Sequence, residues 1–180
     1  MFLKQYIFFF MVIAFAMTMF ISCAKDLKGF EVATNEPIGV AENINLKYTD
    51  SGKLKANLIS PKMFDYSNRD FSFSEFPDGI ILYLYDKDNN KSTVISDYAI
   101  SYDKTGLIDL QGNVVLATNT YDTLFAQQLY YDQNKQWLST NQPVQFRTGG
   151  DLINGNGFDS DVNFEEAEVL EINGILTLDE

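Results

Sequence analysis

The sequence has 180 residues, with 13 Lys and Arg against 25 Asp and Glu, and its formal net charge is −12. It contains no His and a single Cys, Cys23, which excludes Ser-His-Asp and Cys-His catalytic groups, Cys/His zinc sites and an internal disulfide, so we expect no metal and no cofactor. Because a protein neutralises phosphates with clustered Lys and Arg, the acidic balance also excludes nucleic acid as a partner.

The first 22 residues have the pattern of an export signal. Lys4 gives a positive start, and residues 7–21 form an uncharged apolar run of about 15 residues, short of the roughly 20 that cross a bilayer as a helix. The sequence Phe20-Ile-Ser-Cys23 resembles the lipobox of bacterial lipoproteins, with Phe20 where Leu is usual. We therefore expect a signal peptide over residues 1–22 and lipidation of Cys23. The alternative is a short uncleaved anchor helix with an incidental Cys.

Residues 23–42 are polar, include Pro37 and Gly39, and are expected to form a lipidated tether ahead of a domain at residues 43–180. One acyl chain binds a membrane marginally, whereas two or more hold a protein there, so a triacylated Cys23 would be a firm anchor. In both interpretations of the leader, the domain lies outside the cytoplasm.

The domain has the pattern of an all-β protein. Ile44, Leu46 and Tyr48 alternate with polar residues, which is the two-residue period of a half-buried strand, and residues 80–85 are apolar on both faces. Short strands with frequent turn signals favour a sandwich or a rolled sheet, and no helix is expected after the leader. Strands are expected at residues 44–48, 54–58, 71–73, 80–85, 98–102, 106–110, 113–117, 127–131, 144–147, 167–172 and 175–178, and turns at 50–52, 86–90, 103–106, 132–134, 149–151, 156–157 and 173–174.

One hairpin pattern occurs twice. Residues 98–103 end in Tyr-Asp and lead through a turn to a Leu-bearing strand and then Val114, and residues 128–132 lead in the same way to Leu138 and Val144. A repeated hairpin predicts rungs stacked along one axis, with open edges at both ends. Chance similarity between β segments is the alternative.

Several motifs in this order carry a family resemblance. They are Asn-Leu-Lys-Tyr-Thr-Asp-Ser-Gly at 45–52, Phe-Pro-Asp-Gly-Ile at 76–80, Leu-Gln-Gly-Asn-Val at 110–114, and residues 99–103, 128–132 and 150–158. Residues 39 to 174 resemble the LptC family, the periplasmic component of the lipopolysaccharide export machine. The resemblance implies a twisted antiparallel β-jellyroll of the OstA/LptA-like type, open at both ends and with an apolar interior.

The resemblance also implies a non-enzymatic function. In that family the jellyroll receives lipopolysaccharide from an inner-membrane ABC transporter at its N-terminal edge. It passes the acyl chains along its groove to an LptA-like periplasmic jellyroll at its C-terminal edge. The usual member has a transmembrane helix, whereas this chain departs from the family by its lipid anchor. We expect it on the periplasmic side of the cell envelope, anchored to the inner membrane, although residues 24–26 leave the choice of membrane open.

The site hypothesis follows from the acyl chains, since shielding each methylene from water contributes about 0.8 kcal/mol. The sequence does not fix which face of each strand points inward, because a shift of one residue in the pairing reverses the faces. The partner-binding edge is expected at Ile175, Leu176, Thr177 and Leu178. The lipid-binding groove is expected to be lined by Phe73, Ile81, Tyr83, Ile100, Tyr102, Leu110, Val114, Leu116, Leu129, Tyr131, Leu138, Val144 and Phe146.

Two other chemistries have a simpler structural explanation. A glycoside hydrolase would use two carboxylates, but Asp86, Asp103 and Asp132 all lie in predicted turns. Residues 86–90 place oxygen ligands at alternate positions, as a calcium loop does, but Lys91 stands where such a loop needs Gly.

The second candidate function belongs to the binding proteins. A surface or periplasmic lipoprotein could recognise glycans or protein partners through a β-sandwich, with Trp137 as a stacking platform. A strand residue of this kind is more often part of a core.

Overall fold

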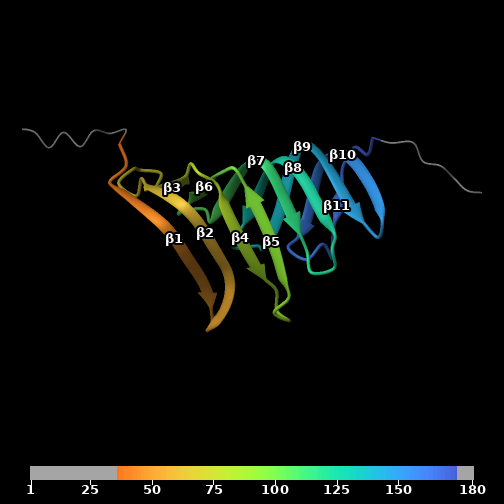
Figure 1. The fold of residues 1–180 in the computed structure, drawn as a ribbon, viewed down its shortest axis with the longest axis horizontal. Helices are drawn as coiled ribbons and strands as arrows, with labels where there is room; N and C mark the ends of the chain where they lie inside the picture. Colours follow the sequence, from red (N-terminus) through yellow and green to blue (C-terminus); the bar gives the residue numbers. More distant parts are fainter. Residues whose placement is uncertain (1–35, 174–180) are drawn as a thin grey trace, which may run out of the picture. The chain divides into compact units, whose positions relative to one another are not determined.

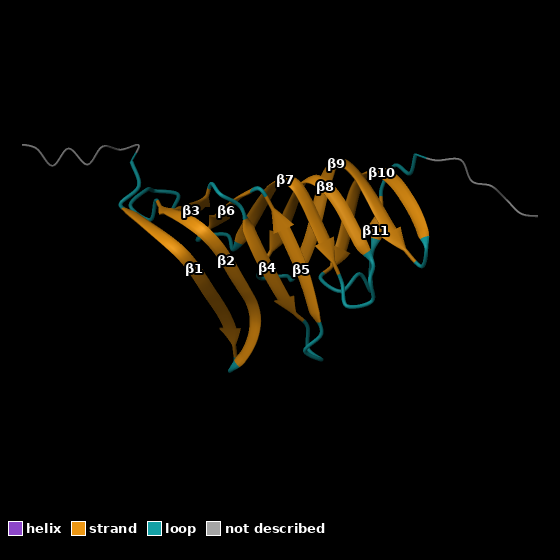
Figure 2. Cartoon of the chain, viewed as in Figure 1, coloured by secondary structure: helices purple, strands orange, loops and turns teal. Residues whose placement is uncertain are grey.

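The computed structural model describes residues 36–173, which contain strands and loops and no helix (Figure 2). No segment among them is a helix able to cross a membrane. The predicted signal peptide, the lipidation of Cys23 and the predicted edge at 175–178 lie outside the described residues. The strands are β1 (Gly39–Asp50), β2 (Lys53–Asp65), β3 (Phe73–Phe76), β4 (Ile80–Tyr85), β5 (Lys91–Ser96), β6 (Tyr98–Tyr102), β7 (Leu107–Ala117), β8 (Thr123–Asp132), β9 (Trp137–Thr148), β10 (Asp151–Asp161) and β11 (Glu168–Val169).

All strand pairs are antiparallel and belong to one sheet that folds over on itself (Figure 1). Strand β7 illustrates the fold, because residues 107–111 pair with β6 whereas residues 115–117 pair with β5. We define layer A as β4, β5 and the parts of β1, β2 and β7–β10 on their side of this bend. Layer B consists of β3, β6 and the remaining parts of the long strands. The expected antiparallel jellyroll is confirmed.

Six strands form a closed ring of hydrogen-bonded neighbours. Strand β2 pairs with both β4 and β3, and β7 pairs with both β5 and β6. Because β4 pairs with β5 and β3 with β6, the order around the ring is β2-β4-β5-β7-β6-β3. Strand β1 extends the sheet beyond the ring on one side, and β8, β9 and β10 extend it on the other.

The long strands bend where the register of their pairing shifts, and these shifts lie at similar positions along neighbouring strands. The register shifts after Gln111 in the β7–β8 pair, and after Asn156 in the β9–β10 pair. Gly112 has φ 72° at the first of these positions, and an added Cβ would come within 3.1 Å of the Asp97 Cβ. An extra residue in one strand bends that strand and increases its twist, so these bulges account for the folding of the sheet.

The hydrophobic core lies between the two layers. Along β4, Ile80, Leu82 and Leu84 are buried, whereas Ile81 between them is 36% exposed. This alternation continues in the long strands, where Leu116 and Leu124 are buried in layer A. The core thus arises because each strand contributes every second side chain to the space between the layers.

The repeated hairpin is confirmed. Strands β6 and β7 form one hairpin, β8 and β9 form the next, and β7 pairs with β8. Their turns also bond to each other, since the Asn134 side chain donates to the Thr105 carbonyl at 2.8 Å and the Gln133 N–H donates to the Gly106 carbonyl.

Several element boundaries were wrong. Strand β1 begins at Gly39, inside the expected tether, where it pairs with the end of β2. Strand β5 was not expected, because Ser92 and Ser96 occupy inward positions where a pattern search requires apolar residues. Residues 156–157 lie within β10, opposite an extra residue in β9, rather than in a turn, and the strand expected at 167–172 is reduced to the two residues of β11.

Candidate functional site: the apolar interior

The space between the layers is open near β1. Leu46 and Tyr48 follow the inward alternation of Ile44 and pair with the inward residues Leu58 and Ala56 of β2. They nevertheless remain 47% and 50% exposed, because nothing among the described residues covers this end. A hollow of about 220 Å³ lies here, lined from layer A by Leu46, Leu58 and Leu82 and from layer B by Ser74, Phe76 and Ile108.

The same space is closed near β9 and β10 by residues 162–167, which we call the closing loop. Its Phe164 ring lies 5.2 Å from the ring of Phe146 in layer A and 5.4 Å from that of Phe158 in layer B. Val162 is 5% exposed, and its carbonyl accepts a hydrogen bond of 2.9 Å from the Ser92 hydroxyl of β5. The closing loop therefore crosses from one layer to the other and fills the space between them.

Asp161 fixes the start of the closing loop. Its carboxylate accepts hydrogen bonds from the N–H groups of Asn163 at 3.3 Å and Glu166 at 3.1 Å, and its carbonyl accepts one from the N–H of Phe164. Phe164 has φ 63°, a left-handed backbone conformation that is strained for a non-glycine residue. These contacts aim the Phe164 ring into the interior.

Eight of the residues proposed to line the groove point into the interior. Burial raises the pKa of Tyr131, as do the nearby Tyr48 and Asp132, so this phenol stays neutral in its apolar surroundings. Whether any of the eight contacts lipid stays a prediction. They are Leu110, Val114, Leu116, Leu129, Tyr131, Leu138, Val144 and Phe146, all buried.

For the other five residues, the predicted side of the sheet is wrong. In β4, the interior positions belong to Ile80, Leu82 and Leu84, so Ile81 and Tyr83 lie on the outer face. A strand that is apolar on both faces carries no alternation from which the parity can be read. The remaining three are Phe73, Ile100 and Tyr102, which alternate with the inward residues Phe76 and Ala99.

The outward aromatic residues have a packing role. Phe73 stacks on Tyr66 at 4.6 Å between ring centroids, and Tyr102 lies 5.5 Å from Phe71. The Arg69 guanidinium lies 4.4 Å from the Tyr66 ring. The loop between β2 and β3 thus covers the outer face of β3 and β6, which explains the apolar residues on that face without a ligand.

Sequence reasoning missed the interior residues at both ends. Leu46 and Tyr48 were recognised as a strand pattern but not as lining, and Phe158 was quoted only as part of a motif. Val162 and Phe164 stand among Asp and Asn residues, and no periodic signal marks them as interior. The only usable signal was the alternation of Ile44, Leu46 and Tyr48.

The carboxylates proposed for other chemistries are engaged in turns. The Asp86 carboxylate accepts bonds from the N–H groups of Asp88 and Asn90 and from the Asn90 side chain. Burial raises the pKa of Asp86, but these hydrogen bonds outweigh burial and lower it. The described residues contain no group of three or more potential metal ligands. Trp137 donates its indole N–H to Asp159 at 3.2 Å, across the β9–β10 pair.

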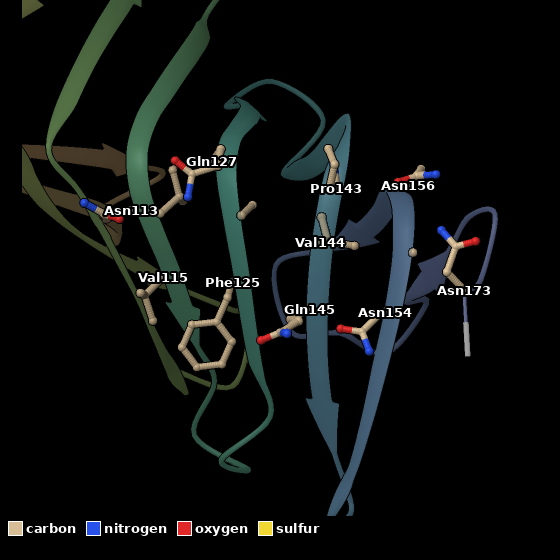
Figure 3. Close-up of a pocket in the computed structure, with 13 residues that line it drawn as sticks. Asn113, Val115, Phe125, Gln127, Pro143, Val144, Gln145, Asn154, Asn156 and Asn173 are labelled. Carbon is tan, nitrogen blue, oxygen red and sulfur yellow. The ribbon is translucent and has the colours of Figure 1, made fainter. Parts of the chain in front are cut away.

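The outer face of layer A carries a second hollow of about 500 Å³ between β7 and β10, lined by both carboxamide and apolar side chains (Figure 3). Figure 3 shows Phe125, Gln145 and Asn154 on neighbouring strands. None of the residues that line this hollow is ionisable. Its carboxamides are Asn113, Gln127, Gln145, Asn154, Asn156 and Asn173.

The two edges of the sheet differ. Within the described part of the chain, β1 pairs only with β2, so its other edge is unpaired. The outer edge of β10 instead carries β11 and the residues that follow it.

Comparison with known proteins identifies the family. The family model LptC, described as lipopolysaccharide-assembly, LptC-related, matches residues 7–175, which is nearly the whole chain. No curated protein sequence matches the chain. Members of the matched family are non-enzymatic components of lipopolysaccharide transport and are associated with the periplasmic side of the inner membrane. With this match and its antiparallel jellyroll, the chain belongs to the LptC-related family of lipopolysaccharide-assembly proteins.

Proposed function

We propose that this protein receives lipopolysaccharide from an inner-membrane ABC transporter and passes its acyl chains between layers A and B to the next periplasmic jellyroll. The observation that carries the proposal is the open end of the interior, where Leu46 and Tyr48 point inward and remain half exposed. An exposed apolar surface on the inner side of a folded sheet is suited to an acyl chain, because each methylene removed from water contributes about 0.8 kcal/mol.

The chemistry of the interior supports an apolar cargo. No Lys or Arg is among the buried residues, and the buried hydroxyl groups of Ser60 and Ser92 already donate to the carbonyls of Gly79 and Val162. A cargo with sugars and phosphates would therefore keep those groups outside the interior, where water solvates them. The net charge of −12 on the chain does not oppose this arrangement.

The difference between the two edges supports a direction of transfer. We propose that the unpaired edge of β1 meets the transporter subunits, since an open strand edge is a template for another strand. The C-terminal edge, formed by β10 and the residues after it including Ile175, Leu176, Thr177 and Leu178, would meet an LptA-like jellyroll. A lipid on Cys23 would hold the protein at the inner membrane.

Crosslinking in cells tests the proposal with a pair of matched positions. Leu46 and Ile95 are 47% and 46% exposed and both lie in layer A, but Leu46 points inward and Ile95 outward. A photoreactive residue at Leu46 is expected to crosslink to lipopolysaccharide, and one at Ile95 is not. The same substitution at Leu138 reports on the deeper interior. Crosslinks at Ile95 without any at Leu46 would contradict transport through the interior.

A second candidate is a lipoprotein that binds glycans on its outer face, as the carboxamide-lined hollow of Figure 3 would allow. Amide groups both donate and accept hydrogen bonds, which suits uncharged sugars. Digestion of intact cells separates the two candidates. Protection of the protein from added protease supports the transport proposal, and cleavage supports the outer-face binder.

A further inference from the structure

The segment that follows β10 also occupies the outer edge of that strand. The N–H of Leu170 donates to the Gly157 carbonyl at 3.0 Å, and the Leu170 carbonyl accepts from the N–H of Asn156 at 3.0 Å. The N–H of Asn173 donates to the Asn154 carbonyl at 2.8 Å. We call residues 168–173 the edge segment. Together with the β11 pairs, it covers β10 from residue 154 to residue 159.

Strand β10 is shaped to receive the edge segment. A Cβ added to Gly155 would lie 2.4 Å from both the Leu170 carbonyl oxygen and a Val169 methyl group. A Cβ on Gly157 would lie 3.1 Å from two carbon atoms of the Leu170 side chain. The two glycines therefore allow an approach of the backbones that other residues would obstruct.

The attachment of the edge segment also contains a repulsive pair. Glu168 lies directly opposite Asp159 in the β10–β11 register, and like charges placed directly opposite each other destabilise a sheet. The surrounding loop adds Glu165 and Glu166, with no Lys or Arg after residue 150 in the sequence. An uncharged strand from another chain would occupy the same edge without this repulsion.

The uncovered part of the edge is too short for a partner. Only residues 151–153 of β10 precede the covered positions, whereas strands in globular proteins are typically about five or six residues long. A partner strand of ordinary length can pair with β10 only where the edge segment now lies.

We propose that the C-terminal docking surface is the β10 edge beneath residues 168–173, and that a β-strand of the partner jellyroll replaces them. Because the edge segment continues directly from the closing loop, its release withdraws Val162 and Phe164 from between the layers. Docking of the partner thereby opens the closed end of the interior. This inference rests on the proposed function, and it adds that the exit opens only when a receiver is attached.

A reversible lock tests the exchange. In full-length protein, Asp159→Cys with Glu168→Cys places two thiols on directly opposite residues, and oxidation ties the edge segment to β10. The probe is a purified LptA-like periplasmic jellyroll from the same cells. The oxidised double variant is expected to bind the probe at least tenfold more weakly than its reduced form. Each single variant, which also controls for a disulfide with Cys23, is expected to bind the probe equally under oxidising and reducing conditions.

The exit is measured with the same lock. With a photoreactive residue at Leu138, the probe is expected to raise crosslinking to lipopolysaccharide several-fold in the reduced double variant and not in the oxidised one. Equal binding of the probe by the oxidised and reduced forms overturns the exchange while leaving the proposed function intact. If wild type and the reduced variant both fail to bind the probe, the proposed function fails and this inference fails with it.

A second variant acts in the opposite direction. Leu170→Pro removes the N–H that bonds to the Gly157 carbonyl and leaves β10 unchanged, so it is expected to weaken the attachment of the edge segment, and the probe should bind several-fold more tightly. Leu170→Ala keeps this N–H and is the control. Weaker binding by Leu170→Pro, with wild-type circular dichroism, would count against the exchange.

Discussion

The two ends of the interior are built from the same kind of alternating strand, but their inward side chains differ in exposure to solvent. Near β1, Leu46 and Tyr48 face the interior and remain half exposed, whereas Leu138 and Phe158 at the other end are fully buried. The difference comes from the closing loop, which adds Phe164 between the layers only at the β9–β10 end. The alternation of side chains therefore determines which side of the sheet a residue faces. Whether that residue is buried depends on whether another segment covers that side.

The largest expected effect separates the two ends by stability. Leu138→Ala is expected to lower the free energy of unfolding by about 2–5 kcal/mol, because it removes buried methyl groups and leaves a cavity. Leu46→Ala, at the open end, is expected to lower it by less than about 1 kcal/mol. Urea unfolding of the purified proteins measures both. Equal losses would mean that the β1 end is also covered.

An intermediate effect is expected for the closing loop itself. Phe164→Ala removes two edge-on ring contacts worth roughly 0.5–1.5 kcal/mol each and is expected to cost about 1–3 kcal/mol. It should also raise the fluorescence of an apolar dye, since the second end becomes open like the first. Phe71→Ala is the control, because that ring is 50% exposed on the outer face. If Phe164→Ala left dye binding unchanged, the loop would not be what closes this end.

The smallest effect is expected at the turns of the β4–β5 and β8–β9 hairpins, in which an Asp carboxylate accepts hydrogen bonds from backbone N–H groups in a similar way. Hydrogen bonds from the N–H groups of Lys135 and Asn134 lower the pKa of Asp132, as those from Asn90 and Asp88 lower that of Asp86. A lowered folded-state pKa gives stability that is present above the unfolded pKa and lost as the pH falls through the folded pKa. Asp132→Asn and Asp86→Asn should each cost under about 1 kcal/mol at neutral pH, with the difference from wild type shrinking as the pH falls below the ordinary Asp pKa of 3.8.

Calorimetry across this pH range would check the prediction for both turns. A loss confined to one of the two variants would show that the two hairpin turns are not stabilised in the same way.

The side of the sheet was predictable where the two faces differ in chemistry. In β8, Leu129 and Tyr131 alternate with Gln128, and the inward parity was correct. In β4 both faces are apolar, so Ile81 was placed on the wrong side. Strand β5 was missed because its inward Ser92 finds its hydrogen-bond partner in Val162, 70 residues later in the chain.

The β9–β10 end of the interior could not be predicted either, because its contacts are made between distant segments of the chain. Gly155 and the Asn156-Gly157 pair indicate a turn when only local sequence is considered, yet they lie within β10. The need for glycine at 155 and 157 is explained by their close approach to Leu170, a contact with a later segment of the chain. The closing loop likewise consists of turn-forming residues, and the packing of Phe164 depends on rings from two strands.

The closed ring of six strands has a mechanical consequence. A pull applied between β1 and β10 would load the sheet across its inter-strand hydrogen bonds. Between β2 and β7 that tension divides over two routes, one through β4 and β5 and the other through β3 and β6. Strand β1 and strands β8–β10 carry it along a single route. Under force, we therefore expect strand pairs outside the ring to separate first, while the six strands of the ring stay paired.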